Sequence, residues 1–284
     1  MSKYTDLHVH STYSDGTCTP SEIIDMAVRL ELNYIALTDH DTVDGIEEMK
    51  NASEIHRKNG YNITIIPGVE LSCAFSGPDL HILGLNIDYK SDILIDKLKE
   101  CKESRRTRND KMIEKMQGLG FDITKEKIYA LYGDVSITRA HFARYLTDMG
   151  YTSSKNEAFE KYLGHNGPVY VQRDKLSPKD AIQLIKAAKG HPVLAHPLLY
   201  NLDDIQLNEL LSQLKEYGLW GIEAIYSLNT PMDEIYLKEL AKKYNLFITG
   251  GSDFHGTNKP DIKLVTGHGN LKIPEELVTN ILKY

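Results

Sequence analysis

The sequence predicts an α/β fold in which helices alternate with the strands of a parallel sheet, with a helical insertion in the middle of the chain. Short apolar runs alternate with helical patterns of roughly 10 to 15 residues, which is typical of βα units. Between about residues 91 and 171 only helical patterns follow one another, which indicates the insertion. Histidines and carboxylates repeatedly follow the apolar runs, as active-site residues do in such folds.

The composition is that of an ordinary globular protein. The chain has 284 residues, 41% hydrophobic and 26% charged, enough for one large α/β domain or two smaller ones. No run approaches the roughly 20 apolar residues of a membrane span, and no signal peptide is apparent. Cys18, Cys73 and Cys101 are widely spaced and odd in number, which argues against a disulfide framework and indicates a reducing compartment. The net charge of −7 disfavours a protein that coats nucleic acid. We expect a cytoplasmic protein outside the membrane, with no obligate protein partner evident.

The first ninety residues contain the first βα units. The first expected strand covers 6–10. Thr19 and Glu22 form a capping box with Pro20 at the first helical position, which predicts a helix over 20–30. The other expected elements of this part are strand 34–38, helix 45–59, strand 63–70 and strand 80–85.

The second part contains the insertion and the remaining units. In the insertion, helices are expected at 92–117, 124–132, 138–149 and 154–163, with glycines as stops at 118, 120, 133, 150 and 164. Ser177 and Pro178 predict a helix start, and that helix ends at Gly190. The elements that follow are strand 191–195, helix 203–217, strand 221–225, helix 232–244, strand 247–250 and a last helix that begins near Pro274.

The candidate site residues are histidines and carboxylates at or just past the ends of the apolar strands. They are His8, His10, Asp15, His40, Glu70, His81, His196, Asp253 and His255. In a strand, residues two apart share a face, so His8 and His10 present two imidazoles side by side. Because the loops after the strands converge, we expect all nine residues to form one site.

Simpler interpretations exist for single members of this set. The His8-x-His10 pattern is weak alone, His81 could be a core histidine, and His196 before Pro197 could be a turn residue. The recurrence of the pattern favours a metal site. Mixed histidine and carboxylate ligands without cysteine suit Mn²⁺, Fe or Zn²⁺. Phosphate-binding loops, dinucleotide-binding glycine motifs, serine nucleophile elbows and His-Glu-x-x-His helices are absent from the sequence, so its chemistry is expected to depend on metals.

Several blocks of the sequence, in order, resemble the PHP (polymerase and histidinol phosphatase) superfamily over nearly the whole chain. They are residues 6–11, 14–16, 37–41, 67–70, 81–84, 195–197 and 251–255. The resemblance implies a distorted (β/α)₇ TIM-like barrel formed by 1–90 and 172–284, with 91–171 as a helical insertion over the site. It also implies up to three divalent metals, with Mn²⁺ expected first. The match is closest to stand-alone members that remove phosphate from nucleoside bisphosphates or mononucleotides and trim short RNA from its 5′ end.

The resemblance also implies a role for each site residue. His8, His10, Glu70 and Asp253 would hold one metal, and Glu70 would bridge to a second metal held by His81 and His196. Asp15, His40 and His255 would hold a third. From the insertion, Arg139 and His141 in the block Ile137–Arg144 would contact the substrate phosphate, although a solvated helix face explains these two residues equally well. Relatives often have Gly-Lys-x-x-Pro where this chain has residues 164–168 (Gly-His-Asn-Gly-Pro), so one lysine contact to substrate is lost or replaced.

These features predict a metal-dependent hydrolase of phosphate monoesters. A hydroxide bridging two cations is a nucleophile near neutral pH, an arginine can clamp the phosphoryl oxygens, and His141 could stabilise or protonate the leaving oxygen. Between Asp96 and Arg144, twelve Lys/Arg face eight Asp/Glu, which favours a small, multiply charged nucleotide or the 5′ end of a short RNA. The alternatives are a histidinol-phosphate phosphatase, a metal-dependent amidohydrolase and a non-catalytic PHP scaffold.

Overall fold

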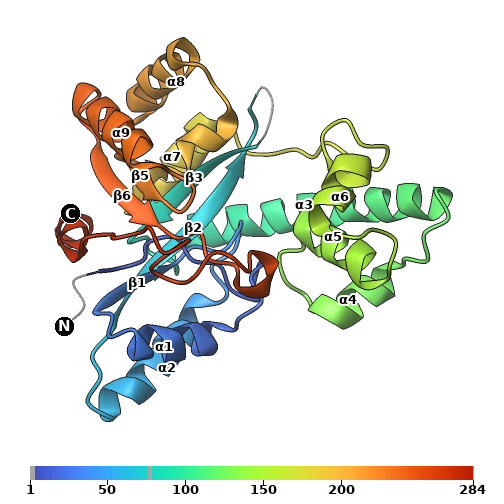
Figure 1. The fold of residues 1–284 in the computed structure, drawn as a ribbon, viewed down its shortest axis with the longest axis horizontal. Coiled ribbons are helices and arrows are strands. Elements are labelled where there is room, and N and C mark those ends of the chain that lie inside the picture. Colours follow the sequence, from blue (N-terminus) through green and yellow to red (C-terminus); the bar gives the residue numbers. More distant parts are fainter. Residues whose placement is uncertain (1–3, 76–78, 284) are drawn as a thin grey trace.

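A curled six-stranded sheet forms the centre of the molecule (Figure 1). The computed structural model describes residues 4–75 and 79–283. The strands pair in the order β1 to β6: β1 (Tyr34–Leu37), β2 (Thr64–Cys73), β3 (Leu80–Leu85), β4 (His191–Leu194), β5 (Gly221–Tyr226) and β6 (Phe247–Gly251). The prediction of an α/β fold is confirmed.

The expected first strand at 6–10 is an irregular segment that bonds to both outer strands of the sheet. Asp6 O accepts from Ala36 N in β1 (2.9 Å), and Leu7 N donates to Gly250 O in β6 (3.2 Å). A regular ladder is interrupted because Val9 N donates to the Thr38 hydroxyl (3.0 Å) and not to a strand carbonyl. The segment therefore forms isolated bridges instead of a strand, but it still lies between β1 and β6.

The prediction of a wholly parallel sheet is wrong at β3, which runs antiparallel to both β2 and β4. No crossover helix separates β2 from β3, and such a short connection can only join antiparallel strands. Two site residues are placed differently as a result. Glu70 lies within β2 instead of at its end, and His81 lies at the start of β3, opposite Ser72.

The inner face of the curled sheet is apolar at one end and polar at the other. Ile66 and Leu83 belong to a buried cluster whose other members include Leu7, Ala36 and Val193. Because side chains alternate along a strand, Glu70 shares the face of Ile66, and His81 shares the face of Leu83. The sheet therefore turns its site residues toward the same interior as its core.

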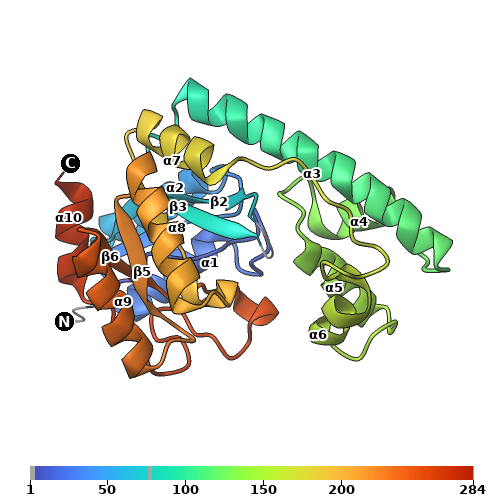
Figure 2. The ribbon, with the colours of Figure 1, turned by 90° about the horizontal axis from the view of Figure 1, so that it is seen from above.

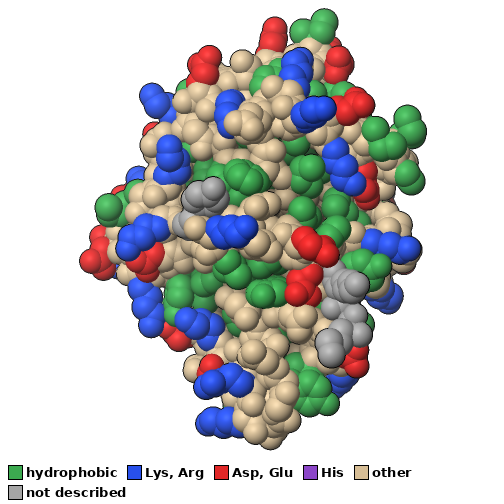
Figure 3. Space-filling view, turned by 90° about the vertical axis from the view of Figure 1, so that its left-hand side faces the viewer, with side chains coloured by type: hydrophobic (Ala, Val, Ile, Leu, Met, Phe, Trp, Pro, Cys, Tyr) green, Lys and Arg blue, Asp and Glu red, His purple; other side chains and the backbone are tan. Residues whose placement is uncertain are grey.

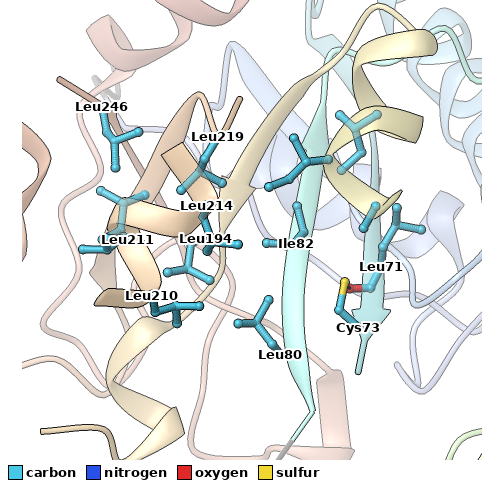
Figure 4. Close-up of a cluster of buried hydrophobic side chains, with 14 of the residues drawn as sticks. Leu71, Cys73, Leu80, Ile82, Leu194, Leu210, Leu211, Leu214, Leu219 and Leu246 are labelled. Carbon is cyan, nitrogen blue, oxygen red and sulfur yellow. Dashed lines mark hydrogen bonds between the residues drawn. The ribbon is translucent and has the colours of Figure 1, made fainter. Parts of the chain in front are cut away.

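Helices cover the outer faces of the sheet. The helices α1 (Pro20–Arg29) and α2 (Ile46–Lys58) pack together beside β1, and α7 (Pro178–Ala187), α8 (Asp204–Tyr217) and α9 (Pro231–Lys243) cover β3 to β6 (Figure 1). Leucines of α8 meet Ile82, Leu80 and Leu194 of the sheet in the larger core (Figure 4). The last helix begins as expected after Pro274, as a 3₁₀ turn at Glu275–Leu277 followed by α10 (Val278–Leu282).

The helical insertion extends to one side of the sheet. Its first helix, α3 (Asp92–Gly118), begins against α7 and carries the shorter helices at its far end (Figure 2). These are α4 (Lys125–Tyr132), α5 (Arg139–Asp148) and α6 (Lys155–Ala158), the last of which continues as a π-helix over Phe159–Leu163. The insertion has its own buried cluster around Met112, Phe142 and Leu146.

The face opposite the insertion shows no concentration of one charge. Lysine and arginine side chains are interspersed with aspartate and glutamate, and hydrophobic side chains lie between them (Figure 3). In the part of the chain that the structure describes, every helix is too short or too polar to cross a membrane.

Candidate active site

Histidines 8 and 10 meet two carboxylates at the polar end of the sheet. The two Nε2 atoms lie 3.1 Å apart, as the expected shared face requires. Glu70 Oε2 is 3.5 Å from His8 Nε2 and 3.2 Å from His10 Nε2. Asp253 Oδ1, just after β6, is 3.7 Å and 3.4 Å from the same atoms. Four side chains thus direct nitrogen and oxygen atoms at one point.

The second oxygen of Glu70 faces a different pair of histidines. Glu70 Oε1 lies 2.9 Å from His81 Nδ1 and 3.0 Å from His196 Nε2, and these two nitrogens are 3.4 Å apart. His40 Nδ1 approaches Glu70 Oε2 to 3.0 Å. Glu70 therefore lies between two groups of histidines and contacts both.

A third group forms around Asp15. Its Oδ1 is 3.2 Å from His255 Nε2 and 3.8 Å from His10 Nδ1, and its Oδ2 is 3.8 Å from His40 Nε2. The structure thus brings all nine predicted residues together in adjoining groups that share His8, His10, His40 and Glu70.

This site fits divalent cations. Its ligand atoms lie within 4.8 Å of one another in each group. Buried Asp15 Oδ1 and His40 Nδ1 have no hydrogen-bond partner among the described residues, and native proteins rarely leave such atoms unsatisfied. Imidazole nitrogens and carboxylate oxygens without thiolates suit Mn²⁺, Fe or Zn²⁺. The site can therefore hold metal.

Neighbouring polar groups orient the ring nitrogens. A carboxylate can only accept, so His8 Nδ1–H donates to Glu223 Oε1 (3.0 Å) and leaves Nε2 for a metal. The carbonyl of Asp253 fixes His255 in the same way, by accepting from its Nδ1–H at 2.8 Å. Glu223 Oε2 also accepts from the backbone N–H of His196 (2.8 Å). One buried carboxylate in β5 thus holds two candidate ligands.

Asp253 has two further partners. Tyr226 Oη donates to its Oδ2 at 2.8 Å, and Lys259 Nζ donates to the same oxygen at 2.6 Å. Sequence reasoning missed these supporting residues. Tyr226 is the last residue of an apolar strand, so the rule that identified the other site residues could have found it, whereas Glu223 lies inside that strand.

Electrostatics keep the carboxylates ionised. Burial alone would raise the pKa of Glu70, but the imidazoles of His81, His40 and His8 hold it well below its usual value. Burial would also raise the pKa of Asp15, but the imidazoles of His40 and His255 outweigh this effect and hold that pKa well below its usual value. Ionised carboxylates are the form that binds metal.

The backbone is strained at the site. Asp41, His196 and Asp253 have positive φ angles of 52°, 28° and 58°, which non-glycine residues rarely adopt. Gly251 is required for close approach, because a Cβ atom there would lie 2.1 Å from His8 Cβ. Unfavourable backbone angles and a close contact at Gly251 thus occur where β6 packs against the N-terminal histidines.

A cavity of about 150 Å³ opens beside the candidate ligands. Asp15, His40 and His81 line one side of it. Its other lining residues include four arginines, Arg105, Arg108, Arg139 and Arg173. Except for Arg139, sequence analysis did not identify these arginines. Arg105 and Arg108 are three residues apart on α3, and that spacing places them on one helix face.

Asp41 ties the insertion to the sheet through two of these arginines. Its Oδ2 accepts from Arg105 Nε (2.9 Å) and Arg173 Nη2 (2.8 Å), and its Oδ1 accepts from Ser72 N (2.9 Å). All three charged side chains are buried. Asp41 follows His40 directly, so this ion-pair network lies next to the candidate ligands.

Of the two residues expected over the phosphate, only Arg139 lines the cavity. Its Nη1 donates weakly to Leu163 O (3.4 Å), and Asp79 Oδ2 lies 3.8 Å from Nη2. His141 is buried behind it. The His141 Nδ1 accepts from Thr138 N (3.0 Å), and Thr138 Oγ1 donates to Asp15 Oδ2 (3.0 Å). Burial lowers the pKa of His141 to about 4, so its ring is neutral at pH 7.

The residues 164–168 lie near Arg139. His165 packs on the ring of Tyr170 (centroids 4.6 Å apart), and the Arg139 guanidinium lies 5.5 Å from the centroid of the same ring. His165, at the position where the family resemblance led us to expect lysine, is thus part of the packing beside Arg139.

Comparison with known proteins agrees with this geometry. The model of the PHP domain family matches residues 6–163, more than half of the chain. The chain belongs to the PHP domain family. A 5′-3′ exoribonuclease of Haemophilus influenzae is 36% identical over 255 residues, covering 90% of this chain and 91% of the relative. A 3′,5′-nucleoside bisphosphate phosphatase of Chromobacterium violaceum is 34% identical over 252 residues, covering 88% and 86%.

Solved structures of PHP-like proteins have the same fold. One from Bifidobacterium adolescentis, described as a proposed metal-dependent phosphoesterase, superposes with a TM-score of 0.84 at 28% identity, covering 98% of this chain and 95% of that one. The prediction that this PHP protein is a metal-dependent phosphoester hydrolase is confirmed by these relatives together with the metal-competent site.

Proposed function

We propose that this PHP protein hydrolyses phosphate monoesters of small nucleotides, with nucleoside 3′,5′-bisphosphates as its preferred substrates, and that it also acts at the 5′ end of short RNA. One observation carries the proposal: the arginine-lined cavity opens directly onto Asp15, His40 and His81. A phosphate in that cavity meets metal ligands on one side and guanidinium groups on the other. The named relatives act on nucleoside bisphosphates and RNA, and their identity to this chain supports the same substrate class.

The nine residues are proposed to hold two or three divalent ions, with Mn²⁺ as the first choice. The contacts support one set of His8, His10, Glu70 and Asp253, and a second set of Glu70, His81 and His196. Asp15, His40 and His255 form the third set. When bound, such cations supply a nucleophile from water near neutral pH and neutralise charge on the phosphoryl oxygens.

The protein's own side chains bind and position the phosphate. Arg139 is proposed to clamp two phosphoryl oxygens with its guanidinium fork, which is worth more than a neutral hydrogen bond. A direct role of His141 at the leaving oxygen stays a prediction. Its buried, neutral ring favours a positioning role. In that role His141 accepts a hydrogen bond from Thr138 N, and the Thr138 hydroxyl in turn donates to the candidate ligand Asp15.

Two proposals concern the whole chain. The segment 5–10 is proposed to act as the seventh strand that closes the barrel, because it bonds to both β1 and β6. Residues 1–90 and 172–284 are proposed as the barrel and 91–171 as the substrate-binding insertion, which has its own buried cluster. Residues 1–3, 76–78 and 284 of these ranges lie outside the described residues. A cytoplasmic location stays a prediction.

A substrate panel tests the proposed function. The Mn²⁺-loaded protein is assayed with a nucleoside 3′,5′-bisphosphate, a nucleoside monophosphate, histidinol phosphate, a 5′-phosphorylated short RNA and simple amides. We expect the highest kcat/KM for the bisphosphate, with a smaller advantage at high salt because surface attraction is screened. A higher kcat/KM for histidinol phosphate than for the bisphosphate would favour a histidinol-phosphate phosphatase. A higher kcat/KM for an amide would favour a metal-dependent amidohydrolase. Absence of all turnover would favour the scaffold.

A further inference from the structure

The catalytic cavity is too small for a whole nucleotide and shares two residues with a larger cavity. Its volume of about 150 Å³ is below the range of roughly 300–1,000 Å³ that is typical of small-molecule sites. A second cavity of about 530 Å³ lies between α3 and residues 171–174. Arg108 and Arg173 line both cavities. A substrate that extends from one into the other therefore passes these two guanidinium groups.

Arg108 is a buried cation without a carboxylate partner. The residue is 5% exposed. Its Nε donates to Asn109 Oδ1 (2.8 Å), and its Nη2 donates to Ile137 O (3.3 Å). Within residues 4–75 and 79–283, no carboxylate lies at ion-pair distance from it. Burying an uncompensated charge costs several kcal/mol, so an anion at Arg108 would be strongly stabilising.

Arg173 brings an unsatisfied donor to the same place. Its Nη2 donates to Asp41, but its Nη1 is buried with no hydrogen-bond partner among the described residues. Arg105, Arg108, Arg139 and Arg173 line the same small cavity, so these guanidinium groups lie close together. Burial, with the charges of the other three arginines, lowers the pKa of Arg108 well below its usual value. Two buried guanidinium groups with free donors match the oxygens of a phosphate.

The charges around this point are unbalanced. Arg105 and Arg173 share the carboxylate of Asp41, and Lys175 and Arg139 share that of Asp79. Arg108 has none, so these five cationic side chains share two carboxylates. The larger cavity is also lined by the carboxylates of Glu100, Glu103 and Asp174, of which Glu100 pairs with Lys97 and Glu103 with Arg106. The positive charge that remains is fixed in place by α3 and by the chain that returns from the insertion to α7.

We propose that Arg108 and Arg173 form a subsite for the second phosphate of a nucleoside bisphosphate, while its nucleoside occupies the larger cavity. Hydroxyl and amide groups of Ser104, Thr107 and Gln172 line that cavity together with the acidic side chains of Glu100, Glu103 and Asp174, and all of these groups can hydrogen-bond a sugar or base. The subsite rests on the proposed function, since it holds the phosphate that is not being cleaved. Such a subsite would make the protein prefer bisphosphates to monophosphates through a contact distant from the reacting atoms.

The test compares two substrates in matched variants. For the parent, Arg108→Gln and Arg106→Gln, kcat/KM is measured for a nucleoside 3′,5′-bisphosphate and for the monophosphate that lacks the second phosphate. In Arg108→Gln the ratio of the two values should fall by about 30-fold or more, mainly through KM, as expected when a buried charge contact is lost. Arg106 lies on the same helix, but it is half-exposed and paired with Asp134 at 2.7 Å, so its variant should keep the parental ratio.

Each outcome separates the subsite from the proposed function. An unchanged ratio in Arg108→Gln, or equal losses for both substrates, would overturn the subsite. If that variant does not fold, Arg108→Lys takes its place, because lysine keeps the charge and loses the fork. In Arg108→Lys, a tenfold fall in the ratio of kcat/KM for the bisphosphate to kcat/KM for the monophosphate supports the subsite. A ratio equal to that of the parent overturns it. A parent that hydrolyses neither nucleotide would instead refute the proposed function.

Discussion

At the scale of single residues, Glu70 is the most informative position. Its two oxygens face different histidine groups, so one substitution disturbs both candidate metal sets. Glu70→Ala should lower kcat/KM for phosphate esters by more than about 100-fold, because even supporting residues of a metal site are worth 10- to 100-fold. Elemental analysis should show fewer metals per chain. Glu54→Gln is the control, since Glu54 is exposed and paired with Arg57. Full activity with unchanged metal content in Glu70→Ala would contradict the assignment.

Arg139 should affect the phosphate and not the metals. Arg139→Ala should lower kcat/KM by roughly 100-fold, because a charge-assisted clamp is lost. Metal content should stay at the parental level, since the polar partners of Arg139 among the described residues are Leu163 O and Asp79 and not any of the nine candidate ligands. Arg144→Ala on the same helix is the control, because Arg144 is more exposed and paired with Asp148 (3.4 Å). If both variants behaved alike, Arg139 would belong to a solvated helix face.

Residue patterns predicted the candidate ligands but not their surroundings. The nine histidines and carboxylates were found because they recur near strand ends. Arg105 and Arg173 were missed because their partner, Asp41, is reached only through the fold of the insertion. His141 matched a family pattern, but its position behind Thr138 depends on helix capping in three dimensions.

At the scale of elements, the contact between β6 and the N-terminal segment depends on Gly251. A Cβ there would lie 2.1 Å from His8 Cβ and 2.7 Å from His8 N. Gly251→Ala should lower the free energy of unfolding by about 1–3 kcal/mol or more, as overpacking does, and should reduce metal content by displacing His8. Urea unfolding and elemental analysis measure the two effects. In the control, Gly118→Ala, the new Cβ meets no atom within 4 Å, so stability should stay constant or rise slightly. Equal stability of the two variants would argue against the close approach.

Local periodicity predicted most helices and strands, but not how they pair. The direction of β3 depends on the short connection from β2, and the periodicity of its apolar residues is the same in either direction. The irregular bonding of residues 6–10 depends on Thr38, just after β1, whose hydroxyl accepts from Val9 N and donates to Val9 O. Pairing and register are therefore properties of tertiary contacts that a single sequence does not display.

At the scale of the whole molecule, the helical insertion and the sheet supply different halves of one site. The excess of Lys/Arg between residues 96 and 144 indicated a basic insertion. The structure shows that several of these charges are paired on the surface, as Arg106 is with Asp134 and Lys125 with Asp110. The positive charge at the cavity instead comes from buried arginines, among them Arg173 outside that window. Net charge thus predicted the location of the basic side but not the residues that form it.

The central claim is that the nine histidines and carboxylates form one multinuclear metal site that hydrolyses phosphate esters. The most direct test is a titration of metal-stripped protein with Mn²⁺, in which phosphoesterase activity is followed against the number of ions bound per chain. We expect no activity without metal and full recovery as two or three ions bind. Full activity in a chain shown by elemental analysis to be metal-free would contradict the claim.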